Sequence, residues 1–283
     1  MSDTHQPIPV SQPEQPSGNP GLSLSPAAEE LYRKLQPLDP HRYTQKRCQS
    51  LALMLEEIRV LKRSRNAVLL AHNYQHPEIF EVADFIGDSL RLSQEAARVE
   101  CEVIVFAGVH FMAETAKLLN PGRTVLLPNL AAGCSLSDTA DADDVEDRIH
   151  ELKAVYPDLA VVCYVNTTAA VKALADACCT SSNAVRIVEA LPSENILFVP
   201  DENLARYVQS KTRKNIIPWN GNCYVHHQIT PENILAARQS APAARVVVHP
   251  ECRADVIALA DAVLSTEGMV QYAKQEDARE FII

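Results

Sequence analysis

The sequence is poor in the features that mark several large protein classes. It has only eight glycines among 283 residues and contains neither GxGxxG nor GxxxxGK[ST], so a glycine-rich nucleotide-binding loop has no support. It has no CxxC pair, which removes the usual signature of a zinc ribbon or a thioredoxin-type site. No apolar run reaches the length of a membrane span, so no membrane association is predicted. Positive charge is also scarce: 26 Lys and Arg against 36 Asp and Glu give a formal net charge of −10, which argues against a nucleic-acid binder.

The N-terminal stretch and the cysteine content bear on where the chain works. Residues 1–26 hold six of the 18 prolines and lack the apolar core of a secretory signal, so they are predicted to form a disordered tail. Without such a signal, the expected compartment is the cytoplasm, which is reducing. The eight cysteines are therefore predicted to be free thiols rather than disulfides.

Three stretches of the chain look like copies of one unit. They occupy residues 68–89, 161–182 and 246–267. In each copy an apolar run ends in a polar residue, at His72, Tyr164 and His249, and an Ala-Asp pair places its Asp twelve residues later. Because repeats place equivalent residues at equivalent points in space, the three strand ends are predicted to converge on one pocket.

Short apolar runs alternate with amphipathic segments from Asn66 onward. Runs such as AVLLA and VIVFA suit strands that are buried on both faces of a parallel sheet, and the stretches between them have helical spacing. The first copy reads as βαβαβαβ, whereas in the second copy the stretches 168–176 and 183–191 both read as helix. The expected fold is α/β, with three pseudo-equivalent αβα units and short parallel sheets around a pseudo-threefold axis.

The same patterns predict the domain organisation. Residues 27–64 have apolar residues at three- and four-residue spacing and are predicted to be helical, with a break at Pro37 and Pro40. The αβα units are expected to cover residues 65–150, 151–240 and 241–283. The third unit is expected to be incomplete, because its third strand, EFII, stands at the last residues.

Polar side chains gather at the predicted carboxyl ends of the strands, where parallel sheets bind their ligands. His72, Tyr164, His249 and Glu251 supply hydrogen-bond donors and a carboxylate, which suit a carboxylate or phosphate ligand and proton transfer. Hydroxyls from the equivalent position of each copy add donors beside helix N-termini; they are Ser89, Ser181 and Thr266. A lone histidine is more often a core or surface residue, but three aligned polar positions favour a site.

Two of the cysteines occupy matching strand-end loops, Cys134 in Ala-Gly-Cys and Cys223 in Gly-Asn-Cys. A neighbouring glycine lets the backbone approach closely, which suits a cluster or a phosphate. With a third thiolate from the third copy, they would leave an open coordination position on an iron–sulfur cluster that acts as a Lewis acid. The alternative is that both are buried apolar cysteines, as free cysteines usually are. The other six cysteines are interpreted as structural.

Several histidines have less support from the pattern. His226 and His227 follow Cys223 closely, so one of them could support a metal ligand, and exposure at the surface is an equally good interpretation. His76 and His110 are weaker candidates still.

Five segments together resemble one known family. They read LAHNYQHPEIFEVADFIGDSLRLSQ, VIVFAGVHFMAETAKLLNPGRTVLLPNLAAGCSLSD, YVNTTAAVKALADACCTSSNAV, GNCYVHHQIT and VHPECRADVIALAD. From about residue 30 onward the chain is similar to quinolinate synthase, the quinolinate synthetase A family. The resemblance implies condensation of iminoaspartate (iminosuccinate) with dihydroxyacetone phosphate to quinolinate, phosphate and water in de novo NAD biosynthesis. It also implies a functional link to L-aspartate oxidase.

The resemblance implies roles for individual residues as well. A [4Fe–4S] cluster would be held in part by Cys134 and Cys223. Acid–base steps would fall to Tyr74 and Glu251. The implied substrate-binding set is His72, Ser89, Tyr164, Asn166, Ser181, His249, Glu251 and Thr266.

The resemblance also raises an expectation about the third copy. Members of the family supply a third cysteine from its last strand-end loop, and this chain ends before that point, so we expect a fragment, a truncated product, or a site completed by a partner or another residue. Cys252 stands at the wrong position of the repeat to replace it. The alternative function is a non-catalytic, dicarboxylate-binding remnant without a stable cluster, and an oxygen or redox sensor is a weaker hypothesis.

Overall fold

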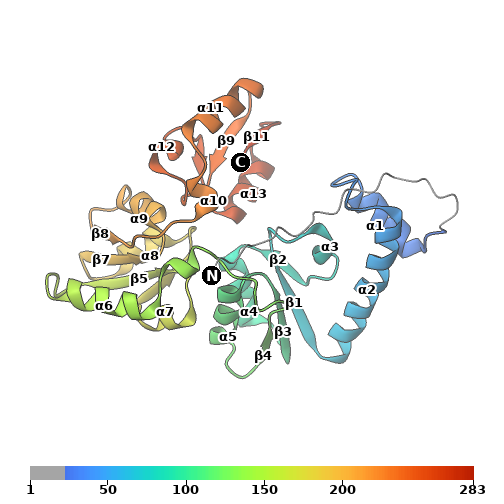
Figure 1. The fold of residues 1–283 in the computed structure, drawn as a ribbon, viewed down its shortest axis with the longest axis horizontal. Helices are drawn as coiled ribbons and strands as arrows, with labels where there is room; N and C mark the ends of the chain where they lie inside the picture. The colour runs from blue at the N-terminus through green and yellow to red at the C-terminus, as the bar shows by residue number, and fades with distance from the viewer. Residues whose placement is uncertain (1–22) are drawn as a thin grey trace, which may run out of the picture. The chain divides into compact units, whose positions relative to one another are not determined.

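The computed structural model describes residues 23–283 (Figure 1). The chain divides into two compact units, one up to Glu57 and one from Ile58 to Ile283. The tail predicted over residues 1–26 lies outside the described residues except for its last four. Across residues 23–283, no helix is both long enough and apolar enough to cross a membrane.

The first unit contains helix α1 (Pro26–Leu35) and the start of α2 (Gln45–Ser64). The side chain of Ser25 caps α1 by accepting the Ala28 N–H at 3.3 Å, and proline stands in the first turn, where its missing N–H costs nothing. Both helices bury one apolar stripe, as their periodicity predicts.

The second unit holds three parallel sheets. The first has the order β2-β1-β3-β4, from β1 (Ala67–His72), β2 (Phe85–Gly87), β3 (Val103–Ala107) and β4 (Thr124–Leu126). The second has the order β6-β5-β7-β8, from β5 (Ala160–Tyr164), β6 (Ala177–Cys179), β7 (Asn195–Val199) and β8 (Asn215–Pro218). The third has the order β10-β9-β11, from β9 (Arg245–Val248), β10 (Ala262–Val263) and β11 (Phe281–Ile282). Each sheet places its first strand between its second and third, which confirms the repeated α/β fold.

Helices connect and cover these strands (Figure 1). Around the first sheet they are α3 (Pro77–Phe80), α4 (Ser89–Arg98) and α5 (His110–Leu119). The short 3-10 helix η1 (Ser137–Thr139) and α6 (Ala142–Lys153) lead to the second sheet, which carries α7 (Ala169–Ala173), α8 (Ala184–Ala190) and α9 (Glu202–Gln209). The rest are α10 (Tyr224–His227), α11 (Pro231–Ser240), α12 (Ala254–Ile257) and α13 (Thr266–Gln275).

The Ala-Asp pair of each copy has a structural role. In every copy the Asp carboxylate accepts the N–H of a residue in the central strand, and the Asp N–H donates to the carbonyl of that same residue. The three pairs are Asp84–Leu69, Asp176–Val161 and Asp261–Val246, with carboxylate distances of 2.7, 2.8 and 2.7 Å. This two-bond clamp joins the short edge strand to the central strand, and it explains the constant spacing of the repeat.

Apolar side chains pack on both faces of the second sheet. One core joins the first and second sheets and includes Phe106, Phe198 and Cys179. A second core lies on the opposite face and includes Val161, Cys163 and Leu197 from the same sheet. Because successive residues of a strand point to opposite faces, the continuous apolar runs of the sequence fill both cores.

One prediction about the second copy was wrong. Residues 168–176 were predicted to be a single helix, but α7 ends at Ala173 and the short strand β6 follows. The strand has three residues, and its outer edge carries no partner strand among the described residues. Pairing with β5 decides its conformation, and three residues are too few to show a strand pattern.

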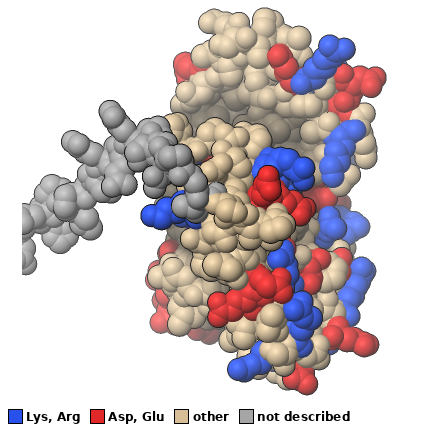
Figure 2. Space-filling view, turned by 90° about the vertical axis from the view of Figure 1, so that its right-hand side faces the viewer, with Lys and Arg blue, Asp and Glu red and all other residues tan. Residues whose placement is uncertain are grey.

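The surface matches the mixed charge of the composition. On the face shown in Figure 2, acidic and basic side chains lie interspersed. No patch of one sign covers that face, so it offers no support for a nucleic-acid partner.

Candidate functional site

A cavity of about 620 Å³ opens at the carboxyl ends of the central strands. Every residue that the resemblance implies for the site, and every strand-end residue, hydroxyl and loop cysteine that the repeat favoured, lines this one cavity. They are His72, Tyr74, Ser89, Cys134, Tyr164, Asn166, Ser181, Cys223, His249, Glu251 and Thr266. The structure therefore brings together side chains from all three copies, as expected from the equivalence of their strand ends.

The three strand-end residues stand at equivalent points of the fold. His72 is the last residue of β1, Tyr164 is the last residue of β5, and His249 directly follows β9. Ser89 and Thr266 are the first residues of α4 and α13, so their hydroxyls lie beside N–H groups that helices leave unpaired.

The two strand-end histidines are held in the same way. The N–H of the residue two positions later donates to Nδ1 of each ring, from Tyr74 to His72 at 3.4 Å and from Glu251 to His249 at 3.3 Å. Nδ1 is thus an acceptor, so a neutral ring carries its proton on Nε2. In His249 that Nε2 lies 3.1 Å from the Ser181 hydroxyl.

Burial keeps both of these rings neutral. It lowers the pKa of His72 to about 4, and it also lowers the pKa of His249 even though Glu251 opposes that change. At neutral pH the two rings are therefore hydrogen-bond donors through Nε2 rather than carriers of charge.

Glu251 is the centre of the polar network. The residue is 3% exposed; one carboxylate oxygen accepts the Tyr164 hydroxyl at 2.5 Å, and the other lies 3.1 Å from Nδ1 of His226. Burial alone would raise the pKa of Glu251, but the hydrogen bond from His226, the nearby His249 and the Tyr164 hydroxyl together lower it to about 2. The side chain is a carboxylate at neutral pH.

His226 is the partner that the sequence left undecided. Its Nδ1 also lies 3.1 Å from Sγ of Cys223, and its ring stacks on His249 with centroids 4.8 Å apart. Burial lowers the pKa of His226, but the hydrogen bonds to Cys223 and Glu251 outweigh it and raise the pKa to about 10. The charged ring therefore balances the buried carboxylate.

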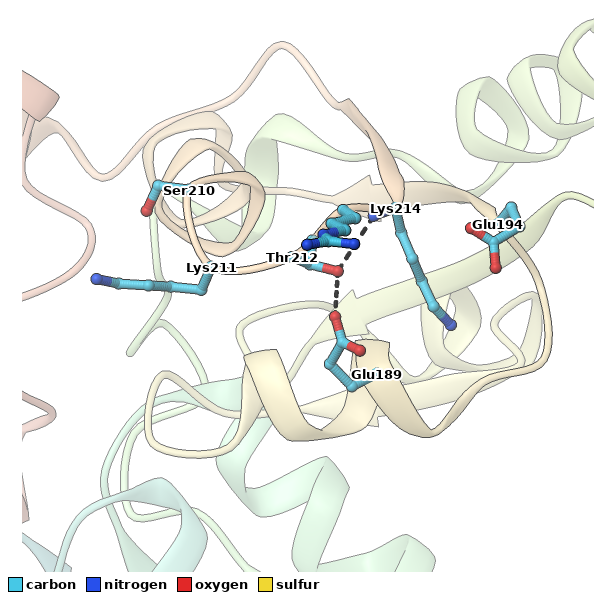
Figure 3. A pocket seen from close by; sticks show the side chains of 7 residues that line it. Glu189, Glu194, Ser210, Lys211, Thr212 and Lys214 are labelled. Carbon is cyan, nitrogen blue, oxygen red and sulfur yellow. Dashed lines mark hydrogen bonds between the residues drawn. The ribbon is translucent and has the colours of Figure 1, made fainter.

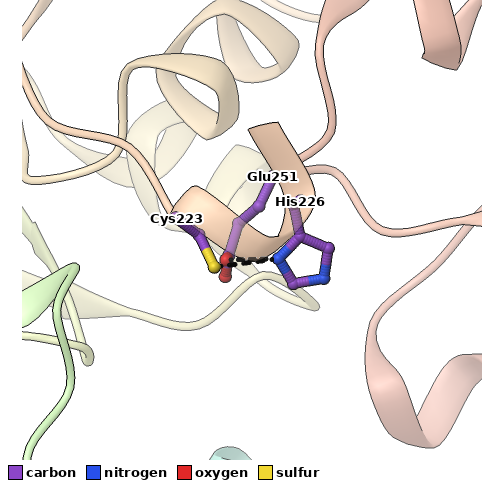
Figure 4. Close-up of side chains that lie close together, drawn as sticks. All are labelled: Cys223, His226 and Glu251. Atoms are coloured by element: carbon purple, nitrogen blue, oxygen red, sulfur yellow. Dashed lines mark hydrogen bonds and ion pairs between the residues drawn. The ribbon is translucent and has the colours of Figure 1, made fainter. Parts of the chain in front are cut away.

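Cys223, His226 and Glu251 form the group best suited to hold a metal among the described residues (Figure 4). Their potential ligand atoms all lie within 4.8 Å of one another. Thiolate, imidazole and carboxylate are ligands that zinc and iron share. Cys134 lines the same cavity from the equivalent loop of the first copy.

The loop before Cys223 depends on a close backbone approach. A Cβ on Gly221 would lie 2.2 Å from the Thr139 hydroxyl oxygen and 2.6 Å from the Pro200 carbonyl oxygen. Asp201 then holds the loop, because its buried carboxylate accepts the Cys223 N–H at 3.0 Å and caps α9. Burial, together with Glu251, raises the pKa of Asp201 to about 7.

The sequence did not predict Asp201, and it left the choice between His226 and His227 open. Asp201 stands in an ordinary Pro-Asp-Glu stretch after a strand, with no pattern that links it to Cys223. His226 could have been favoured over His227, because a spacing of three residues from Cys223 brings both side chains to one face of a short helix. His227 instead pairs with Asn203 at 3.3 Å.

The other two weak histidine candidates, His76 and His110, are not among the residues that line the cavity. His76 stands at the N-cap of α3 without a capping hydrogen bond from its side chain. His110 is half exposed and lies 3.8 Å from Glu114 one helical turn later.

A larger and more open hollow of about 680 Å³ lies beside α8 and β8 (Figure 3). Its polar groups bind one another: the Thr212 hydroxyl donates to Glu189, and the Lys214 ammonium donates to the Val188 carbonyl at 3.0 Å. It is not lined by any of the strand-end residues. The strand-end cavity is therefore the better candidate for chemistry.

Comparison with known proteins finds similar sequences of one family. The family model described as quinolinate synthetase A protein matches residues 56–283. The quinolinate synthase of Thermodesulfovibrio yellowstonii is 56% identical over 230 residues, which cover 81% of this chain and 75% of that protein. The quinolinate synthase of Methanosarcina barkeri is 51% identical, with 82% of this chain and 75% of that protein covered. That of Desulforudis audaxviator is 53% identical, with 81% and 75% covered.

Proposed function

The chain belongs to the quinolinate synthetase A family, and on that basis we propose that it condenses iminoaspartate (iminosuccinate) with dihydroxyacetone phosphate to quinolinate, phosphate and water in de novo NAD biosynthesis. The observation that supports this most is that all the residues implied for the reaction line one cavity. The reaction is assigned to the cytoplasm, with iminoaspartate supplied by an L-aspartate oxidase.

The cavity suits a small anionic substrate. Its lining contains no Lys or Arg, so recognition rests on neutral donors and helix N-termini. The Nε2–H groups of His72 and His249 and the hydroxyls of Ser89, Ser181 and Thr266 provide such donors. Tyr164 and Asn166 complete the set from the end of β5, and Oδ1 of Asn166 is buried without a hydrogen-bond partner, ready for a ligand donor.

The donor set also fits a [4Fe–4S] cluster. Burial raises the pKa of the Cys134 thiol, and the nearby Cys223 and Glu251 raise it further. Cys134 and Cys223 are thus two thiols in one lining that has no Lys or Arg, and a cationic iron centre would favour their thiolate forms. Cys134 and Cys223 would hold the cluster, which when bound supplies a Lewis acid that polarises a substrate oxygen.

The proton transfers are assigned to the residues around Glu251. As a carboxylate at neutral pH, Glu251 would accept a proton from the substrate, and Tyr164 and His226 hold it in place. Tyr74 is 56% exposed, and its ring lies against His72 with centroids 3.9 Å apart. Burial, with Cys134 nearby, raises the pKa of Tyr74 above the usual value, so the phenol stays protonated at neutral pH and would donate a proton to the leaving group.

Anaerobic reconstitution with iron and sulfide tests the proposal. The reconstituted chain is expected to show the visible absorption of an iron–sulfur cluster and to form quinolinate from both substrates. The variant Cys101→Ser is the matched control, because Cys101 is a partly buried thiol that does not line the cavity. Substrate binding without a cluster and without turnover would instead identify a dicarboxylate-binding remnant.

A further inference from the structure

We propose that Cys163 and Cys178 form a dithiol site that reacts with low-molecular-weight disulfides such as glutathione disulfide and closes to a reversible intramolecular disulfide. The site goes beyond the proposed reaction, because neither cysteine lines the cavity. Both are free thiols in the structure, which is the reduced state of the site.

The register of the second sheet places the two cysteines side by side. Cys163 of β5 is the direct partner of Cys178 in the parallel strand β6. Neighbouring strands lie about 4.8 Å apart, and disulfides join Cα atoms that are about 4.4 to 6.8 Å apart. Directly paired residues also point to the same face of a sheet. Closing the bond therefore needs only a local adjustment of a three-residue edge strand.

The two thiols differ in the way that a two-step exchange requires. Cys178 is exposed on the edge strand, so an external disulfide can reach it. Cys163 is buried in the apolar core beside Val161 and Leu197, so only an internal reaction can reach it. Cys178 is thus the thiol that attacks first, and Cys163 is the thiol that resolves the mixed disulfide.

Charge around the pair favours the same order. The neighbouring Cys163 thiol and the nearby Lys172 ammonium lower the pKa of Cys178 to about 7, and this outweighs the partial desolvation of a sulfur that faces the sheet. The Cys178 thiol and burial raise the pKa of Cys163. Near neutral pH a large share of Cys178 is therefore thiolate, which is the reactive form of cysteine.

The reaction is a balanced thiol–disulfide exchange. The Cys178 thiolate attacks one sulfur of glutathione disulfide, breaks its S–S bond and releases one glutathione thiolate. Cys163 then attacks the Cys178 sulfur and breaks the mixed disulfide, and its proton passes to the departing glutathione, which leaves as the thiol. Overall the two protein thiols are oxidised to one disulfide, and one glutathione disulfide is reduced to two glutathione molecules.

The two cysteines lie close to residues that line the cavity. Cys163 precedes Tyr164, and the Lys172 ammonium donates to the carbonyls of Val165, at 2.9 Å, and Thr167. Those two residues flank Asn166, which lines the cavity. A disulfide between Cys163 and Cys178 would shift the end of β5, which leads directly to Tyr164 and Asn166 in the cavity lining.

Cys179 provides a matched control beside the pair. It follows Cys178 in β6 but points to the opposite face, into the core shared with Phe198. It is fully buried, and burial raises its pKa well above the ordinary value. The variant Cys179→Ala should leave the disulfide unchanged.

The test is intact-mass and peptide analysis of the full chain in glutathione buffers of increasing oxidised fraction. Trypsin cuts after Lys172, so the expected disulfide joins two peptides, 154–172 and 173–186. This link should appear with the loss of two hydrogens, vanish on reduction, and persist in Cys179→Ala. In Cys163→Ser the reaction should stop at one glutathione on Cys178, and in Cys178→Ser neither product should form. A link that survives in Cys178→Ser, or wild-type protein that stops at the glutathione adduct in every buffer, would overturn the proposal.

Discussion

Replacing Glu251 by Gln should separate the chemistry of the site from its architecture. In the wild type the Tyr164 hydroxyl lies 2.5 Å from the carboxylate, and the amide oxygen of the variant can still accept it. The substitution removes the negative charge opposite His226. Loss of a positioned general base lowers turnover by about 100- to 10,000-fold. Binding of iron and sulfide by Cys134 and Cys223 should persist, because neither thiol is altered.

The same variant should also lose stability. Glu251 is fully buried, and removing one partner of a buried ion pair costs about 3 to 5 kcal/mol because the other charge stays uncompensated. His226 can lose its proton in response, so we expect the lower end, about 3 kcal/mol. Urea unfolding at neutral pH measures this loss.

A matched control is Glu151→Gln, which removes a carboxylate from an exposed pair with Arg148 on α6. Such pairs contribute about 0.5 kcal/mol or less, so both stability and turnover should stay close to those of the wild type. Turnover of Glu251→Gln within about twofold of the wild-type rate would refute the base role.

Three further results are expected. Cys134→Ala and Cys223→Ala should each lose most bound iron and sulfide in anaerobic reconstitution, as measured by metal and sulfide analysis; full loading of either variant would remove that cysteine from the ligand set. Because the folded-state pKa of His72 is lowered to about 4, its contribution to stability is complete above its unfolded pKa near 6.5 and is lost as the pH falls toward 4. Between pH 7.5 and pH 5, the free energy of urea unfolding should therefore fall by about 2 kcal/mol less in His72→Asn than in wild type. An equal fall in the two proteins would contradict a neutral His72 ring in the folded state. Gly221→Ala should destabilise the fold by about 1 to 3 kcal/mol through overpacking. Gly122→Ala is the control, because its Cβ would meet nothing within 4 Å. Equal thermal unfolding temperatures of the two variants would contradict the close backbone approach at Gly221.

Much of the fold follows from the sequence, because the central strands are buried on both faces. Strands such as β5 and β7 are apolar at almost every position, and this leaves a clear apolar run in the sequence. The edge strand β6 was missed for the opposite reason. Its three residues owe their conformation to pairing with β5 and to the clamp by Asp176, and both are contacts between distant parts of the chain.

The site was predictable to the extent that the repeat places equivalent residues together. His72, Tyr164 and His249 stand at strand ends in all three copies, so their convergence follows from topology. The roles of His226 and Asp201 could not be deduced in this way. Their positions depend on how the loop around Cys223 folds back against its neighbours, and no periodic pattern records that.

The protonation states of the site residues likewise could not be predicted from the sequence. A histidine at a strand end suggests a group that titrates near neutral pH, but burial lowers the pKa of His72 to about 4. The hydrogen bonds to Nδ1 then assign the tautomer of both strand-end rings. These properties come from packing, which differs between positions that look alike in the sequence.

The most direct test of the proposed function is product analysis with the reconstituted chain under anaerobic conditions. Supplied with iminoaspartate and dihydroxyacetone phosphate, it should release quinolinate and inorganic phosphate in equal amounts, and Glu251→Gln with the same iron and sulfide content should release neither at a comparable rate. A chain that carries a full cluster and binds substrate, yet forms no quinolinate, would contradict the proposal.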